Sequence, residues 1–307
     1  MTVPDTLWRL EQASLGQRLR EVSLRIGPGV TAVLGQSGAG KTSLLNLLVA
    51  FERPDAGTVT ATLERGAHRR PLFWVPQGDG LWPHLSARQH LVETGSGEAD
   101  ALLAEFGLTE RAAALPETLS QGERARLAVA RALAADSAVL VMDEPLAHVA
   151  PGRAGDYWAV VRRRAQAASV SLVFATHAPG TVLAEAEHVI CLDEGRVVYA
   201  GGVEELYWRP PSAELAVCLG EANWFEPADA WLWLLREEPG PRCLRPEQLL
   251  VAPAPDGRLL VEAARFHGAV AEVQLRDPAT GAVRRFWHRP AGNHLSPGTR
   301  VNLETRQ

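Results

Sequence analysis

A glycine-rich run that ends in lysine and threonine is the first feature of this sequence that could do chemistry. Residues 35–42, GQSGAGKT, match G-x-x-x-x-G-K-[ST] at each fixed position. Glycines let backbone N–H groups curl inward around an anion, while Lys41 supplies a point charge and Thr42 a hydroxyl for Mg²⁺. We therefore expect a nucleotide site that takes ATP and Mg²⁺, against the alternative of a glycine-rich turn that happens to contain Lys-Thr. The residues expected to bind the nucleotide here are Gly35, Gln36, Ser37, Gly38, Ala39, Gly40, Lys41, Thr42 and Ser43.

Two adjacent carboxylates form the second candidate feature. The apolar run VLVM (139–142) ends in Asp143 and Glu144. In this interpretation Asp143 holds Mg²⁺ through water, and Glu144 orients and polarises the water that attacks the γ-phosphate. The alternative is a pair of surface acids in a strand-to-loop turn. The upstream glycine-rich loop favours the catalytic interpretation, because such a loop needs an acid-bearing strand beside it.

These side chains need a scaffold of alternating strands and helices. Residues 22–34 contain a glycine-proline turn and then an apolar β-rich run, and residues 41–51 carry apolar residues at helical spacing. The loop therefore lies between a strand and a helix. Apolar runs without alternation are typical of buried parallel strands, which favours a parallel α/β sheet. Further strands are expected at 72–77, 139–142, 171–177 and within 188–202, and helices at 98–106, 109–115, 122–135 and 153–168.

Composition excludes several classes of function. The net charge of −5 leaves no basic excess, which argues against a nucleic acid partner. The N-terminus lacks the layout of an export signal, and no run reaches the roughly 18 apolar residues that span a bilayer. The three cysteines lie far apart, which favours reduced thiols over a disulfide framework or a zinc site. We expect a protein of the cytoplasm.

The character of the chain changes after residue 218. Proline, glycine and tryptophan become frequent, helical spacing fades, and short alternating runs separated by turns indicate antiparallel strands. We therefore expect one domain at 1–218 and a small β-barrel-like domain at 219–307.

The pentapeptide LSQGE (119–123) identifies a family. Residues 35–202 resemble the ATPase subunit of ABC transporters, because five features occur in that family's order and at similar spacing. The resemblance implies a P-loop ATPase core with a parallel sheet and a helical subdomain at about 81–135, which receives the membrane subunit. The five features are the glycine-rich loop, Gln77, Leu119–Glu123, the pair Asp143-Glu144 and His177.

The resemblance also implies roles for these residues. Two such domains face each other head to tail, and each ATP is held by the phosphate loop of one subunit and the LSQGE segment of the other. Gln77 would contact Mg²⁺ and the attacking water, and His177 would contact the γ-phosphate and Glu144. The alternative for LSQGE alone is an ordinary helix cap. The nucleotide contacts implied for this segment are Ser120, Gln121, Gly122 and Glu123.

The rest of the chain resembles importer ATPases. Residues 207–225 and 244–250 resemble their linker and an OB-like accessory domain of the TOBE type, found in uptake systems for iron(III), polyamines, sulfate, molybdate or sugars. This implies a homodimer bound to integral membrane permease subunits at the cytoplasmic face of the membrane, served indirectly by a solute-binding protein. The LRPEQLL segment favours iron(III) or a polyamine as solute. The alternative is a regulatory or soluble ABC-type ATP-binding module with weak turnover.

The sequence departs from the family pattern in several ways, of which two concern the adenine and the contact between the two active sites. Leu15 occupies the position of the aromatic residue that usually stacks on adenine, and Trp8 is a distant substitute. After the acid pair, Ala147, His148, Val149 and Ala150 stand where the family tends to read SALD, so the aspartate that ties the two active sites together is Ala150.

Overall fold

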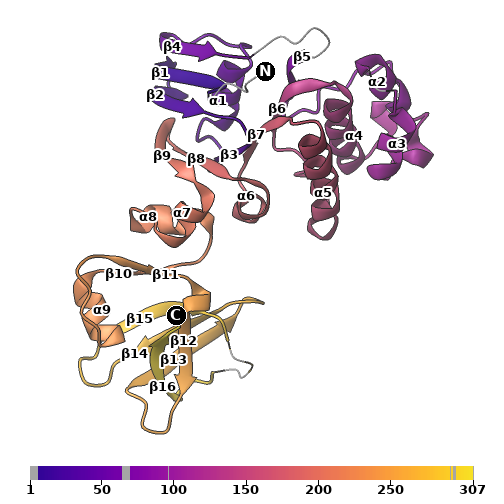
Figure 1. The fold of residues 1–307 in the computed structure, drawn as a ribbon. Coiled ribbons are helices and arrows are strands. Elements are labelled where there is room, and N and C mark those ends of the chain that lie inside the picture. The colour runs from indigo at the N-terminus through magenta and orange to yellow at the C-terminus, as the bar shows by residue number, and fades with distance from the viewer. Residues whose placement is uncertain (1–5, 64–69, 96, 291, 293–294, 307) are drawn as a thin grey trace. The chain divides into compact units, whose positions relative to one another are not determined.

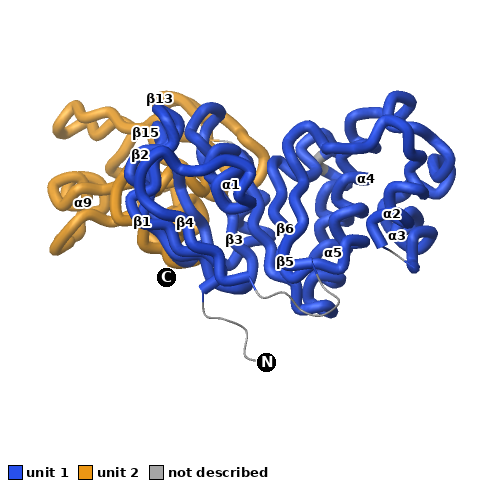
Figure 2. Tube along the Cα trace, turned by 90° about the horizontal axis from the view of Figure 1, so that it is seen from above, with its two compact units in different colours: residues 1–203 blue, residues 204–307 orange. Residues whose placement is uncertain are grey.

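The chain divides into two compact units, Met1–Val203 and Glu204–Gln307 (Figure 2). The structure is a computed structural model and describes residues 6–63, 70–95, 97–290, 292 and 295–306. Within these ranges, no helix is both long enough and apolar enough to cross a membrane. Each unit has its own hydrophobic core, and each is described below by itself.

A six-stranded sheet organises the first unit. Its strands are parallel, except that β9 runs antiparallel to β8. The central strands are buried because helices lie against the sheet, which explains their continuous apolar sequences. The predicted parallel α/β sheet is therefore confirmed (Figure 1). In spatial order the strands are β5 (Arg70–Val75), β6 (Ser137–Asp143), β7 (Ser171–Thr176), β3 (Val30–Leu34), β8 (His188–Asp193) and β9 (Arg196–Gly202).

A second, antiparallel sheet in this unit was not anticipated. It consists of β2 (Leu19–Ile26), β1 (Trp8–Leu15) and β4 (Ala56–Ala61), in that order. Helix α1 (Lys41–Leu48) shares a hydrophobic core with this sheet and with the large sheet. Alternation in β1 is broken at Gln12, where φ is +49° and the pairing register shifts, so the period-two pattern of a strand is interrupted there.

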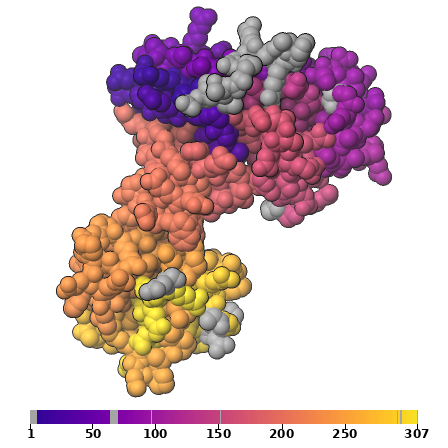
Figure 3. Space-filling model, viewed as in Figure 1, coloured from indigo at the N-terminus to yellow at the C-terminus, as the bar shows by residue number. Residues whose placement is uncertain are grey.

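Helices form the other end of the first unit. Figure 3 shows the indigo N-terminal strands and the purple helical segment at opposite sides of this unit. The prediction of a helix over residues 109–115 was wrong: only Thr109–Arg111 forms a 3₁₀ turn. Leu115 is extended because Pro116 follows it, and the residue before a proline avoids the helical region. The helices are α2 (Ala87–Thr94), α3 (Ala99–Glu105), α4 (Gln121–Ala134), α5 (Pro151–Ala167) and α6 (Pro179–Glu185).

The second unit contains the expected antiparallel strands. Its five-stranded sheet has the order β12-β16-β13-β14-β15, and the edge strands β12 and β15 approach each other, so the sheet curves towards a barrel. Short helices and a two-stranded ribbon precede it. The strands are β10 (Asn223–Phe225), β11 (Arg242–Leu244), β12 (Leu249–Pro253), β13 (Leu259–Phe266), β14 (Ala271–Arg276), β15 (Val283–His288) and β16 (Arg300–Thr305), and the helices α7 (Val203–Trp208), α8 (Ala213–Ala216) and α9 (Pro227–Leu234).

A fully buried arginine explains where the second unit begins. The guanidinium of Arg245 donates to the backbone carbonyls of Tyr207 and Ala216, both at 2.8 Å, and of Gly220 at 3.3 Å. It also lies over the Tyr207 ring, 4.1 Å from its centre. Residues 204–218 therefore belong to the second compact unit, whereas the sequence-based boundary placed them with the first domain.

Candidate active site

The glycine-rich loop connects β3 to α1, as its sequence predicts. Gly38 and Gly40 have φ values of +84° and +103°, in the left-handed region that favours glycine. A Cβ at Gly35 would lie 2.6 Å from the Leu192 carbonyl oxygen, so a side chain does not fit there. The loop therefore needs glycine for close backbone approach and for its turn, and its N–H groups precede the positive end of α1.

Lys41 extends over this loop. Its ammonium group donates to the carbonyl oxygens of Gly35 at 2.8 Å and Gln36 at 3.1 Å, and lies 3.7 Å from Glu144 Oε1. Lys41 is the only lysine among the 31 basic residues of the sequence, so the loop retains lysine where every other cation is arginine. A compact ammonium group fits this position because it is a point charge on a flexible stem, which a planar guanidinium is not.

The side chains of Asp143 and Thr42 form the metal-site candidate. The Thr42 hydroxyl donates to Asp143 Oδ2 at 2.6 Å, which joins the first turn of α1 to the end of β6. Asp143 is buried, and burial raises the pKa of its carboxyl, although the Thr42 hydrogen bond lowers it. Its other oxygen, Oδ1, has no hydrogen-bond partner among the described residues. A hydroxyl beside an unsatisfied buried carboxylate oxygen fits Mg²⁺, which prefers oxygen ligands.

Glu144 is turned out of the strand towards His177. Its backbone has a φ of +50°, and its N–H donates to the Ala175 carbonyl oxygen on the neighbouring strand β7 at 3.0 Å. Its carboxylate oxygen Oε1 lies 2.9 Å from His177 Nδ1. The glutamate side chain is 11% exposed and the histidine 65% exposed, so the base candidate is sheltered and its partner faces outward. This geometry suits a carboxylate that orients a water molecule.

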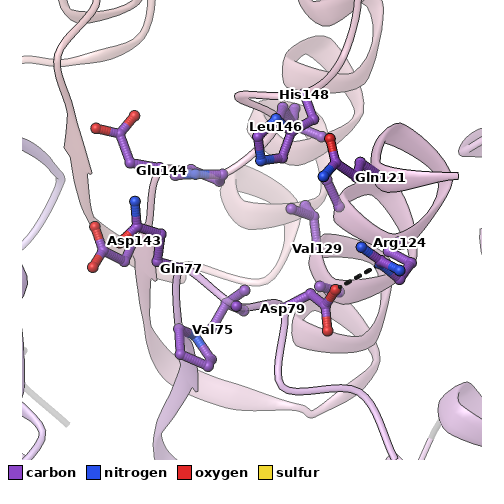
Figure 4. Close-up of a pocket in the computed structure, with 15 residues that line it drawn as sticks. Val75, Gln77, Asp79, Gln121, Arg124, Val129, Asp143, Glu144, Leu146 and His148 are labelled. Carbon is purple, nitrogen blue, oxygen red and sulfur yellow. Dashed lines mark ion pairs between the residues drawn. The ribbon is translucent and has the colours of Figure 1, made fainter. Parts of the chain in front are cut away.

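Gln77 follows the strand adjacent to the acid strand. Val75 pairs with Met142 in the parallel register of β5 and β6. The two strands therefore end at the same edge of the sheet, and Gln77 follows one while the acid pair ends the other. Gln77 lines a pocket of about 230 Å³ together with Asp143 and Glu144. Figure 4 shows these side chains around the pocket. The structure therefore gathers Gln77 with the acid pair, as the sequence predicts.

The LSQGE segment begins α4 as a capping box. The Ser120 hydroxyl accepts from the Glu123 N–H at 3.2 Å, and the Glu123 carboxylate accepts from the Ser120 N–H at 2.8 Å. The Ser120 hydrogen bonds lower the pKa of Glu123, and Arg111 adds an ion pair at 3.1 Å. The alternative interpretation of this segment, a helix cap, is thus part of its structure. Gln121 lines the pocket with Glu144, whereas no residue of the loop 35–42 does.

Comparison with known proteins decides the family. The family model of ABC transporters matches residues 19–147. The Fe(3+) ions import ATP-binding protein FbpC of Serratia marcescens is 31% identical, with 93% of this chain and 92% of that protein covered. The chain belongs to the ATP-binding subunits of ABC transporters. Its prediction as an ABC-type ATPase of the importer group is confirmed by such relatives.

Other ABC proteins extend the comparison. The molybdenum import ATP-binding protein ModC of Methylococcus capsulatus is 35% identical over 64% of this chain and 58% of that protein. A solved ATP-binding subunit of an ABC transporter has a TM-score of 0.57 at 22% identity, with 66% of this chain and 92% of that chain covered. A dimeric bacterial ABC transporter cassette has a TM-score of 0.55 at 22% identity, with 64% and 99% covered. These structures share the fold of the ATPase core.

The altered loop of this ABC subunit contacts its own LSQGE helix. A Cβ at Gly122 would lie 3.0 Å from the His148 carbonyl oxygen, so glycine permits the close approach of the two segments. His148 also lines the pocket beside Glu144 (Figure 4). Ala150 stands before the first turn of α5 without a side-chain cap. The position that carries the family's aspartate therefore offers no polar side chain here.

Neither of the two residues considered for adenine stacking is exposed to a ligand. Leu15 is 5% exposed and belongs to the core. Trp8 is fully buried, and its indole N–H donates to the Leu48 carbonyl oxygen at 2.9 Å. The suggestion of Trp8 as a substitute is therefore wrong.

The sequence analysis did not predict that two arginines of α4 bind the segment after Gln77. Arg131 of α4 donates to the carbonyl oxygens of Gly80 at 2.6 Å and Asp79 at 3.1 Å, and its guanidinium lies over Trp82. Arg124 forms an ion pair with the Asp79 carboxylate at 3.1 Å (Figure 4). The arginines along residues 122–135 were the available signal, but their partners lie far away in sequence.

Proposed function

We propose that the chain is the ATP-hydrolysing subunit of an ABC importer that works as a homodimer at the cytoplasmic face of the membrane, docked on separate permease subunits. The observation that carries this proposal is the convergence of Lys41, Asp143, Glu144 and His177 at one edge of the sheet. A binding module without turnover would need neither a sheltered carboxylate nor its histidine partner.

Each residue has a part in the proposed hydrolysis. Lys41 and the loop amides would hold the β- and γ-phosphates, and Thr42 and Asp143 would hold Mg²⁺, which when bound would neutralise charge on the phosphate oxygens. Glu144 orients the attacking water and accepts its proton, and His177 holds the carboxylate in place. Ser120 and Gly122 complete the site of the opposite subunit at a helix N-terminus.

The single lysine allows a direct test. An amine-selective reagent can modify only Lys41 and the terminal amine. Mass spectrometry can therefore measure the labelling of Lys41 relative to that of the terminal amine. MgATP should protect Lys41 and leave the terminal amine reactive. Lys41→Ala should abolish ATP binding in calorimetry. Equal labelling of Lys41 with and without MgATP contradicts the assignment of the loop.

We propose iron(III) as the transported solute. A separate solute-binding protein would bind it and deliver it to the importer. The support is that FbpC proteins of Serratia marcescens and Pseudomonas fluorescens match 93% and 89% of this chain, into the second unit. ModC of Methylococcus capsulatus matches 64% and FbpC 2 of Pectobacterium atrosepticum 62%. Cells that lack the gene should grow poorly on limiting iron(III) and normally on limiting molybdate. The reverse result would assign the chain to molybdate uptake instead.

A regulatory ABC-type module with weak turnover is the competing function, and Ala150 is the observation that favours it. Steady-state phosphate release from the purified protein, measured with and without its permease, separates the two. Turnover that rises with the permease supports the importer.

A further inference from the structure

Arg18 borders the end of the phosphate loop that faces away from the acid pair. Thr42 points to Asp143, and Ser43 is the next residue of α1, turned by about 100° around the helix axis. The Arg18 guanidinium lies on that other side, with Nη1 3.4 Å from Ser43 Oγ. The Arg18 carbonyl oxygen also lies so close to Gly40 that a Cβ there would be at 2.6 Å.

This placement defines which end of a nucleotide Arg18 meets. The terminal phosphate belongs beside Lys41, because that ammonium lies next to Glu144. The nucleoside of a nucleotide bound in this way would leave the loop on the side away from Asp143, which is the side of Ser43 and Arg18. The Arg18 side chain is 53% exposed and can contact a ligand there.

Glu52 holds the Arg18 guanidinium by its edge. Arg18 Nη1 donates to Glu52 Oε1 at 3.0 Å and Nη2 donates to Glu52 Oε2, a two-point pairing that fixes the plane of the group. Asn46 donates to Glu52 Oε1 at 2.8 Å and so fixes the carboxylate in turn. The carboxylate occupies the Nη1/Nη2 edge and fixes the plane of the group. Both flat faces of the guanidinium therefore stay open to a ligand, together with the Nε edge.

We propose that Arg18, oriented by Glu52, stacks its guanidinium face on the nucleotide base and serves where an aromatic ring is missing. The inference rests on nucleotide binding at the phosphate loop. The two residues that could have supplied an apolar or aromatic surface, Leu15 and Trp8, are both buried in the core. Guanidinium groups stack on aromatic bases through their planar face, and such stacking tolerates any base. The site therefore distinguishes ATP only weakly from GTP.

The test compares ligands with and without a base. Calorimetry measures the binding of ATP, GTP and inorganic tripolyphosphate to the full chain and to Arg18→Ala. The variant should bind both nucleotides about tenfold more weakly, the size expected for one lost stacking contact, with unchanged affinity for tripolyphosphate. Arg25→Ala removes the same charge from an exposed position of strand β2, which begins directly after Arg18, and should change none of the three affinities.

Two more variants separate stacking from charge. Arg18→Trp should restore nucleotide affinity because an indole ring stacks, whereas Arg18→Lys should not, because an ammonium group has no planar face. Glu52→Gln should weaken nucleotide binding less than Arg18→Ala does. Thermal unfolding of each variant checks the fold.

Three results overturn the inference: unchanged nucleotide affinity of Arg18→Ala, an equal loss of tripolyphosphate affinity, or full recovery by Arg18→Lys. The second and third would assign Arg18 to a phosphate. Absence of ATP binding by the unaltered chain would instead contradict the proposed function.

Discussion

His177 and Glu144 meet at the edge of the sheet, with Nδ1 of the imidazole 2.9 Å from Oε1 of the carboxylate. They lie at the ends of the parallel neighbours β7 and β6, and the pairing of those strands brings them together. The carboxylate is the more buried of the two groups. The sheet thus presents a sheltered base that is oriented from its exposed side.

Glu144→Gln should stop hydrolysis while ATP binding persists. The amide keeps the shape of the side chain but cannot accept a proton, and loss of a general base costs about 10² to 10⁴ in rate. Phosphate release measures the rate, calorimetry measures binding, and size-exclusion chromatography with MgATP should show an accumulated dimer. Turnover within severalfold of the unaltered protein would remove Glu144 as the base.

Asp143→Asn should stabilise the metal-free protein and abolish the stabilisation by Mg²⁺. Burial raises the pKa of Asp143, so its charged form costs stability, and this cost grows as pH rises through the unfolded pKa towards the folded one. A neutral amide carries no such cost, but it is a poorer metal ligand. Thermal unfolding at pH 7.5 with ATP, in EDTA and in Mg²⁺, measures both effects. A melting temperature of the variant that rises with Mg²⁺ as much as that of the unaltered chain would contradict the metal assignment.

Local motifs were predictable from sequence, whereas distant pairings were not. The loop 35–42 and the acid strand follow from fixed spacings, because each is a strand or helix end whose chemistry depends on adjacent residues. The Arg18–Glu52 pair and the Arg131 contacts join segments that no local pattern connects. Strand β1 was missed because its bulge at Gln12 interrupts the alternation on which strand prediction depends.

Gly122→Ala should lower hydrolysis without weakening ATP binding by the phosphate loop. The added methyl group would lie 3.0 Å from the His148 carbonyl oxygen, so the loop after Glu144 or the LSQGE helix has to shift. Hydrolysis depends on both segments, whereas the first contacts of ATP are made by Lys41 and the loop amides. Phosphate release and calorimetry on the same sample test this. Gly152→Ala is the matched control, since a Cβ there meets no atom within 4 Å among the described residues.

Acid should destabilise the first unit through His90. Its Nε2 accepts from the backbone N–H of Trp82 at 2.8 Å, so Nδ1 donates to the Ser86 carbonyl oxygen and the ring is neutral. Burial lowers the pKa of His90, the charges of Arg131 and His84 add to this effect, and the Ser86 hydrogen bond and Asp79 oppose it. The folded state then binds a proton less readily than the unfolded state.

The stabilisation is therefore present above the unfolded pKa of about 6.5 and is lost as pH falls below it. Urea unfolding of the unaltered chain and of His90→Gln at pH 7.5, 6.5 and 5.5 measures the free energy of unfolding. The difference between the two should change with a slope of up to about 1.4 kcal/mol per pH unit below pH 6.5. His288, whose pKa burial also lowers, is present in both proteins and cancels. Parallel pH profiles would show that His90 does not titrate as inferred.

Truncation should show whether the first unit ends at residue 203, as in the structure, or at residue 218, as expected from the sequence. A fragment of residues 1–203 ends where the first unit ends and keeps Lys41, Asp143 and Glu144, so it should fold and bind ATP with the affinity of the full chain. A fragment of residues 1–222 retains the segment that Arg245 holds but loses Arg245 itself, so the carbonyl oxygens of Tyr207, Ala216 and Gly220 lose their donor. It should melt less cooperatively and be cleaved by protease after residue 203. Equal protease resistance of the added segment in this fragment and in the full chain would show that residues 204–222 are held by the first unit instead.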